Sequence, residues 1–120
     1  DGAVIAYGLR NLADPAAGLA ELRRLLRPGA RAAVLDFNRP DPASAAGRRT
    51  AALQRQLLRR LVVPVASRAG LGEHYAYLER SLERFPSAGA QEALARGAGF
   101  GQVRHRPLAG GLMGLLQLVA

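Results

Sequence analysis

Three linked stretches decide the fold: Tyr7-Gly8-Leu9-Arg10-Asn11, Leu25-Leu26-Arg27-Pro28-Gly29-Ala30-Arg31 and Leu35-Asp36-Phe37-Asn38-Arg39-Pro40. The first stretch follows an apolar run and contains a glycine, which is typical of a buried strand that enters a turn. The second closes a leucine-rich segment with Pro-Gly, a helix stop. The third ends another apolar run. Together they predict a strand, a helix and a second strand, which form a βαβ unit.

Apolar spacing and capping residues set the expected boundaries of this unit. Residues 3–7 alternate little, which indicates a strand buried on both faces. Asp14 offers an N-cap oxygen for the helix, and Pro15 fits its first position. Residues 32–35 predict the next buried strand, and Asp36 follows at its C-terminal edge.

The middle of the chain predicts a loop and then an arginine-rich helix. Residues 38–47 are rich in Pro, Asp, Ser and Gly, and a helix is expected from about Ala45 to Leu61, ended by Pro64. Leucines gather on one side of this helix (Leu53, Leu57, Leu61) and arginines on the other (Arg48, Arg49, Arg55, Arg59, Arg60). The pattern fits a solvated basic face that covers a core helix. It also fits arginines that meet anionic lipid headgroups.

The last third of the chain predicts helices followed by a hairpin. Residues 67–75 are expected to form a glycine-containing linker before a short helical stretch that ends at Phe85-Pro86. Another helix is expected from about Ser87 to Arg96. Two strands, about 101–107 and 112–119, are separated by a glycine-containing turn and predict an antiparallel pair.

Composition narrows the possible functions. A chain of 120 residues with 49% hydrophobic content fits a single domain with a core. The absence of Cys excludes disulfides and thiolate metal sites, and no His or carboxylate spacing predicts a metal. The net charge is +8, and all 17 basic residues are arginine. Because the few aromatic residues are not interleaved with arginines, nucleic-acid binding is not expected.

Further motifs carry a resemblance to a known family. Besides the Arg-Asn pair at the first strand end, they are Tyr75-Ala76-Tyr77-Leu78, Ser81-Leu82-Glu83-Arg84-Phe85-Pro86 and Ala109-Gly110-Gly111-Leu112-Met113-Gly114. The chain resembles the S-adenosylmethionine-dependent C-methyltransferases of ubiquinone and menaquinone biosynthesis, and within them the cyanobacterial branch that methylates the phylloquinone precursor. The resemblance implies an α/β fold: the C-terminal half of a class I methyltransferase (Rossmann-like) fold that ends in an antiparallel hairpin.

The resemblance also implies a function. Residues 1–120 are expected to be the C-terminal part of a single methyltransferase domain, without the N-terminal cofactor-binding half and inactive alone. The expected reaction is C-methylation of a prenylated naphthoquinol by S-adenosyl-L-methionine, with demethylphylloquinol as the favoured acceptor. Demethylmenaquinone or a ubiquinone precursor is the alternative acceptor, and a basic membrane- or nucleic-acid-binding module without catalysis is the alternative of another class. The expected location is cytoplasmic, with peripheral membrane contact left open.

In open α/β sheets, ligands bind outside the carboxyl ends of the strands. The resemblance to the family implies roles for residues near these strand ends. The expected catalytic residues are Arg10 and Asn11. Cofactor contacts are expected from Ala6, Tyr7 and Gly8, with Gly8 serving either a tight turn or dense packing. Substrate contacts are expected from Asp36, His74, Tyr75, Tyr77 and Met113. The aromatic residues in this set are equally compatible with ordinary core, and His105 is expected to face solvent.

Arg10 carries the sharpest hypothesis. A guanidinium leaving a buried strand needs partners, so Arg10 could pair with Asp36 or Asp14 and simply fix the loop. Alternatively, it could hold the developing phenolate of a quinol acceptor or orient a water that takes the proton. Arginine is not itself expected to be the base, because its pKa exceeds about 12. Asn11 could hydrogen-bond the quinol oxygen or brace Arg10.

Overall fold

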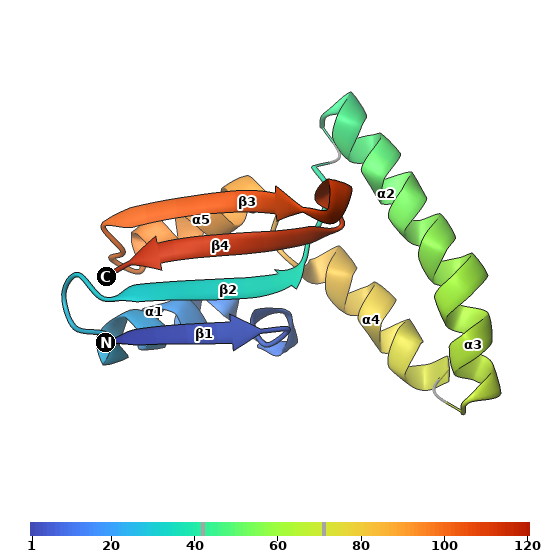
Figure 1. Cartoon of the computed structure of the whole chain (residues 1–120), viewed down its shortest axis with the longest axis horizontal. Helices are drawn as coiled ribbons and strands as arrows, with labels where there is room; N and C mark the ends of the chain where they lie inside the picture. The colour runs from blue at the N-terminus through green and yellow to red at the C-terminus, as the bar shows by residue number, and fades with distance from the viewer. Residues whose placement is uncertain (42, 71) are drawn as a thin grey trace.

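The computed structural model describes residues 1–41, 43–70 and 72–120, and these form one mixed sheet of four strands. The strands are β1 (Gly2–Ala6), β2 (Arg31–Phe37), β3 (Gln102–Leu108) and β4 (Met113–Val119), in the order β1-β2-β4-β3 (Figure 1). β1 and β2 are parallel, whereas β4 runs antiparallel to β2 and β3. The predicted hairpin is therefore confirmed, with the short 3-10 helix η3 (Ala109–Gly111) at its turn.

The predicted βαβ unit is also confirmed. Helix α1 (Pro15–Leu25) joins β1 to β2, and the carboxylate of Asp14 accepts a hydrogen bond from the backbone N of Ala17 at 3.1 Å, as expected of an N-cap. A 3-10 helix, η1 (Leu9–Asn11), lies between β1 and α1. Gly29, in the Pro-Gly stop, has a φ of +79°, a left-handed conformation that favours glycine.

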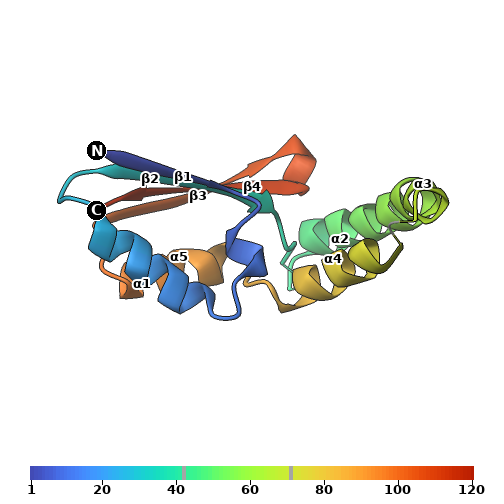
Figure 2. The same ribbon diagram turned by 90° about the horizontal axis from the view of Figure 1, so that it is seen from below.

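Helices cover one face of the sheet only. α1 and α5 (Ala88–Gly97) lie against the same face, and the opposite face is bare in the described structure (Figure 2). The core lies between this helix layer and the sheet, and consists of Leu9, Leu19, Ala32, Val34, Phe85, Ala95, Phe100, Leu116 and Leu118. The expectation that the first strand is buried on both faces is wrong. Val4 on the bare face is 80% exposed, because no described element covers it.

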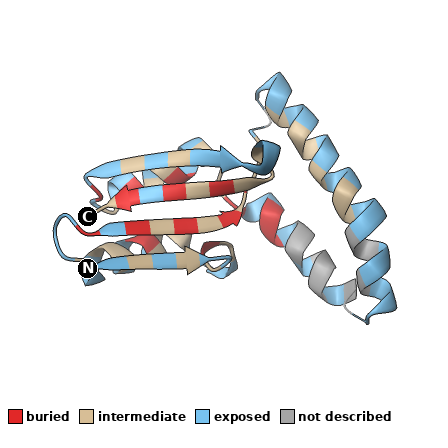
Figure 3. Ribbon diagram, viewed as in Figure 1, coloured by how far each residue is buried: buried red, intermediate tan, exposed pale blue. Residues whose placement is uncertain are grey.

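The remaining helices form an arm that projects from the sheet (Figure 1). It consists of α2 (Ala45–Leu57), the π-helical segment η2 (Leu58–Val62), α3 (Val63–Arg68) and α4 (Gly72–Arg84). α2 contains no buried residue, and Leu61 is 61% exposed. The burial colours in Figure 3 separate the red centre of the sheet from the largely exposed α2. Among the described residues of the arm, the buried ones are Ser81 and Leu82, in the last turn of α4.

Two predicted boundaries in the arm are wrong. Pro64 does not end the helix but occupies the second position of α3, directly after η2. η2 and α3 are continuous, and the π-helical hydrogen-bond register directly before Pro64 lets the helix accommodate a residue without an N–H. The expected linker over residues 67–75 is much shorter, because α3 extends to Arg68 and α4 begins at Gly72.

Candidate active site

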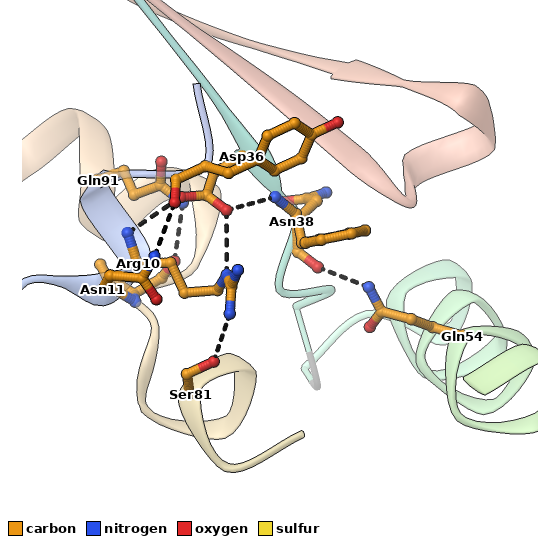
Figure 4. A network of polar contacts seen from close by, with 10 residues as sticks. Arg10, Asn11, Asp36, Asn38, Gln54, Ser81 and Gln91 are labelled. Atoms are coloured by element: carbon orange, nitrogen blue, oxygen red, sulfur yellow. Dashed lines mark hydrogen bonds and ion pairs between the residues drawn. The ribbon is translucent and has the colours of Figure 1, made fainter. Parts of the chain in front are cut away.

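A buried ion pair joins the ends of β1 and β2. Arg10 Nε donates to Asp36 Oδ1 at 3.1 Å, and the backbone N of Arg10 donates to Asp36 Oδ2 at 3.0 Å. Their side chains are only 8% and 4% exposed. Arg10 Nη1 also donates to Ser81 Oγ of α4 at 2.6 Å, so Figure 4 shows Arg10 between the sheet and the arm. Of the two acids considered as partners for Arg10, Asp36 makes the pair, whereas Asp14 caps α1.

The backbone turn after β1 aims Arg10 toward Asp36. Tyr7 has a φ of +55°, which is uncommon for a bulky residue, and its backbone N donates to Leu35 O at 2.8 Å. Asn11 Nδ2 donates to Tyr7 O at 2.9 Å and closes the turn. Gly8 serves dense packing, because a Cβ there would lie 2.8 Å from Ile5 Cγ2. Left-handed backbone at a non-glycine residue stores strain, a feature that clusters at functional sites.

Asn38 is a second polar junction, which the sequence analysis did not single out. Its backbone N donates to Leu112 O at 2.9 Å, and its Nδ2 donates to Gly111 O at 3.1 Å. Its carbonyl oxygen accepts from Gln54 Nε2 of α2 at 3.1 Å, which ties the arm to the strand end (Figure 4). Asn38 follows Asp36 by two residues, so both lie on the same face of the chain, and this spacing is the signal that could have identified it.

Some of the predicted site residues meet on the helix side of the sheet. Arg10, Asn11 and Tyr77 line one cavity of about 450 Å³, and Asp36 lies behind Arg10 through the ion pair. The aromatic ring of Tyr77 is not core, because this residue is 51% exposed.

The other predicted site residues lie elsewhere. Ala6 and Met113 lie at the carboxyl end of β1 and the start of β4, in the rows of side chains that face the bare side. Met113 pairs in register with Phe37, whose ring lies 5.5 Å from that of Tyr7. The side chains of His74 and Tyr75 lie outside the described part of the chain. The predicted set therefore forms a polar group beside α4 and an apolar group at the bare face, and the two meet at the carboxyl edge of the sheet, where Arg10 Cζ lies 5.5 Å from the centre of the Phe37 ring.

The expectation that His105 faces solvent is wrong. Its ring is half-buried and packs on Gly114, where a Cβ would approach Nε2 to within 2.4 Å. The backbone N of His105 donates to Glu92 Oε1 at 2.8 Å. Burial lowers the pKa of His105, and the nearby Glu92 carboxylate only partly opposes that shift. Backbone hydrogen bonding from His105 in turn lowers the pKa of Glu92. Among the described residues, no group of His, Asp or Glu side chains could hold a metal ion.

The sheet order and helix layer define an S-adenosylmethionine-dependent methyltransferase fold. A solved structure described as a SAM-dependent methyltransferase, possible histamine N-methyltransferase, from Thermotoga maritima matches with a TM-score of 0.55 at 16% identity. The match covers 99% of this chain and 55% of that chain. Residues 1–117 match the ubiE/COQ5 methyltransferase family, and the chain belongs to this family.

Relatives with assigned names share close sequence similarity over nearly the whole chain. The 2-phytyl-1,4-naphtoquinone methyltransferase of Nostoc punctiforme is 47% identical over 97% of this chain and 48% of its own length. The enzyme of the same name from Synechocystis is 46% identical, and the chloroplastic enzyme of Arabidopsis thaliana is 35% identical. The chain thus spans about half the length of the curated relatives it matches. No helix in the described residues is long and apolar enough to cross a membrane.

Proposed function

We propose that residues 1–120 are the C-terminal part of a single methyltransferase domain, and that the whole protein methylates a ring carbon of a prenylated naphthoquinol. The favoured acceptor is the phylloquinone precursor, demethylphylloquinol. The proposal is supported by relatives that carry the name 2-phytyl-1,4-naphtoquinone methyltransferase at 43–47% identity. Demethylmenaquinone and ubiquinone precursors remain the alternative acceptors within the family.

The observation that carries this proposal is the position of Arg10. Its guanidinium lies at the carboxyl edge of the sheet, where ligands bind in open α/β folds. Nε and Nη1 are bonded to Asp36 and Ser81, whereas Nη2 has no hydrogen-bond partner in the described structure. Asp36 and Ser81 therefore hold the guanidinium in place and leave one nitrogen for an oxygen of the acceptor. A fixed donor of this kind stabilises a developing oxyanion without reorganisation.

The residues at the end of β1 fit one side of the cofactor. Ala6 is small and exposed, and the ring of Tyr7, 43% exposed, could contact a cationic sulfonium. We assign cofactor contacts to Ala6, Tyr7 and the close-packed backbone at Gly8. S-adenosylmethionine supplies a methyl group on a positively charged sulfur, which keeps the bonding electrons when the methyl leaves. Because these residues make only one side of a site, the isolated chain of residues 1–120 should bind no S-adenosylmethionine in a calorimetric titration.

Arg10 would act on the acceptor in this scheme. With the acceptor hydroxyl ionised, oxygen electrons enter the ring, and the ring carbon forms its bond to the methyl group. Arg10 Nη2 would donate to the oxyanion, and Asn11, which lines the same cavity, would contact the acceptor from the η1 side. The ring proton is lost to solvent afterwards, which restores the aromatic ring as a quinolate, and its oxygen takes a proton from solvent to give the quinol.

Substitution of Arg10 in the full-length protein tests this role. The Arg10→Ala variant should lose about 10²–10³ in kcat, as when an oxyanion donor is removed, while its affinity for S-adenosylmethionine changes little. Arg10→Lys should recover part of the rate, because it keeps the charge but not the planar fork. Arg24→Ala is the control, since it removes an exposed arginine that does not line the cavity. A variant of Arg10 that binds cofactor poorly yet turns over normally at saturation would refute the assignment.

We also propose that the arm lies at the membrane surface, where a prenylated substrate resides. The arm exposes Leu53, Leu61, Val65 and Tyr77 beside its arginines. Exposed apolar side chains interleaved with arginines suit an anionic lipid interface.

Liposome sedimentation of the full-length protein tests the membrane contact. Binding should weaken with salt, because exposed charges are screened over about 8 Å at physiological ionic strength. Replacing Arg48, Arg55 and Arg59 with Gln should weaken it further. Replacing Arg24, Arg27 and Arg96 with Gln removes the same number of positive charges from the region of the sheet and its helix layer. This change should weaken liposome binding less. Equal partitioning of the two triple variants would count against the arm as the contact.

A further inference from the structure

Two more arginines lie close to Arg10, on the face of helix α4 that meets η1. Arg80 and Arg84 are one helical turn apart, with Ser81 between them in sequence, and all three residues line the cavity of about 450 Å³ that contains Arg10. Tyr77, a further turn back, lines the same cavity. Residues at these spacings share a helix face. The volume is within the range of small-molecule pockets, about 300–1,000 Å³.

The charges around this cavity are unbalanced. Its lining contains three arginines and no Asp or Glu among the described residues. Of the nearby described carboxylates, Asp14 caps α1, Glu83 does not line the cavity, and Asp36 is 3% exposed with both oxygens already accepting hydrogen bonds from Arg10. Neither Arg80 nor Arg84 makes an ion pair within the described part of the chain. Like charges four residues apart on a helix destabilise it, so the arrangement favours occupation by an anion.

We propose that Arg80 and Arg84 complete, with Arg10, a three-arginine site for the ionised hydroxyl of the methyl acceptor. This inference rests on the proposed function. The acceptor would be bound as its monoanion: the O–H bond breaks, the proton passes to water, and the electron pair stays on oxygen. None of the arginines takes the proton, because each stays charged at any working pH. Their combined charge lowers the pKa of the bound hydroxyl, so that the anion predominates near neutral pH.

This arrangement gives the three arginines different tasks. Arg10 is nearly buried and fixed by Asp36 and Ser81, so it defines where the oxygen sits. Arg80 and Arg84 are exposed at the cavity rim and add charge without a fixed geometry. The exposed pair should therefore govern the ionisation of the acceptor more than the orientation of its ring.

The pH profile of the full-length protein tests the proposal. In the Arg80→Gln/Arg84→Gln variant, the acidic limb of the kcat profile at saturating reduced quinol, which reports ionisation in the bound complex, should move up by about one pH unit, as expected when opposite charges near an acid are removed. The Arg80→Lys/Arg84→Lys variant keeps both charges, so its acidic limb should lie close to that of wild type. Arg24→Gln/Arg27→Gln is the matched control, because it removes the same charge from the far end of the sheet. An unmoved limb in the folded Gln variant overturns the proposal.

A binding measurement separates this proposal from the proposed function. The probe is 2-hydroxy-1,4-naphthoquinone, an acidic naphthoquinone that is anionic at neutral pH. Measured by calorimetry, the probe should bind wild type and the Arg24→Gln/Arg27→Gln control with equal affinity. It should bind the Arg80→Gln/Arg84→Gln variant about tenfold more weakly. Equal affinity in all three proteins contradicts the anion site even if methyl transfer is observed. Selective binding without methyl transfer to any quinol supports the anion site and contradicts the proposed reaction.

Discussion

The sheet with its helix layer and the arm are held by different forces. Nearly all fully buried side chains, among them Leu116 and Leu118 of β4, lie between the sheet, α1 and α5. The described part of the arm has no buried residue in α2 and buries one leucine in α4, Leu82, and its contacts with the sheet include two polar ones, Arg10 with Ser81 and Gln54 with the carbonyl of Asn38. Hydrophobic burial thus stabilises one region, and a few directional bonds position the other.

This difference matters because the candidate site lies at the junction. Arg10 belongs to the rigid region through Asp36, yet its cavity is completed by Tyr77, Arg80 and Arg84 of the arm. The less stable arm suits a surface that must admit a large lipid-like acceptor, because ligand-binding elements tend to be among the less stable parts of a structure.

The largest stability effect should follow from breaking the buried ion pair. Asp36→Ala leaves the Arg10 guanidinium buried without its partner and should lower the free energy of unfolding by about 3–5 kcal/mol. Glu21→Ala removes an exposed ion pair with Arg24 and should change the free energy of unfolding far less, because solvent screens an exposed pair. Denaturant titration of the full-length protein checks both. Similar decreases in the free energy of unfolding for the two variants would show that the Arg10–Asp36 ion pair is not buried in solution.

Matched leucine truncations should separate the two regions next. Leu116→Ala removes a side chain that is 1% exposed and should cost about 2–5 kcal/mol. Leu61→Ala, at a position 61% exposed, should change the free energy of unfolding by less than about 0.5 kcal/mol. The same titration measures both. Comparable losses would mean that the arm is packed on something in solution and is not the weakly held region described above.

A smaller effect is expected from loosening the arm. Gln54→Ala removes one hydrogen bond to Asn38 and should reduce the free energy of unfolding by about 1 kcal/mol. Limited proteolysis should nevertheless cut faster within residues 45–70, because one of the two polar attachments is lost. Gln56→Ala is the control on the same helix. Unchanged cleavage in the Gln54 variant would indicate that the contact with Asn38 does not hold the arm.

The smallest expected effect is a pH dependence from His105. Because burial lowers its pKa in the folded state, the unfolded chain binds the proton more readily. The contribution of His105 to stability is therefore complete above its unperturbed pKa of 6.5 and declines as the pH falls below it. Stability of wild type should decrease more between pH 7 and 5.5 than that of His105→Gln, in thermal unfolding monitored by circular dichroism. Parallel curves would show that the ring is hydrated in solution.

The βαβ unit and the terminal hairpin could be predicted because their information is local. Asp14 and Pro15 start α1, the Pro-Gly stop ends it, and apolar runs mark the strands. The bare face of β1 could not be predicted, since burial depends on which elements cover a strand. The continuation of the helix through Pro64 could not be predicted, because no local residue pattern indicates the π segment that precedes it.

The candidate site was predictable in part for the same reason. Arg10 and Asp36 stand at consecutive strand ends, so their proximity follows from parallel topology. Ser81 lies 71 residues from Arg10 in sequence, and nothing local indicates that they meet. Arg80 and Arg84 belong to the same site only because the last turn of α4 docks beside η1.

The most direct test of the account is a methyl-transfer assay of the full-length protein with three reduced acceptors. These are the quinols of 2-phytyl-1,4-naphthoquinone, demethylmenaquinone and a demethylated ubiquinone precursor, each supplied with isotopically labelled S-adenosylmethionine. We expect label on a ring carbon and the highest kcat/KM for the phytylated naphthoquinol. Binding of S-adenosylmethionine without transfer to any of the three acceptors would contradict it.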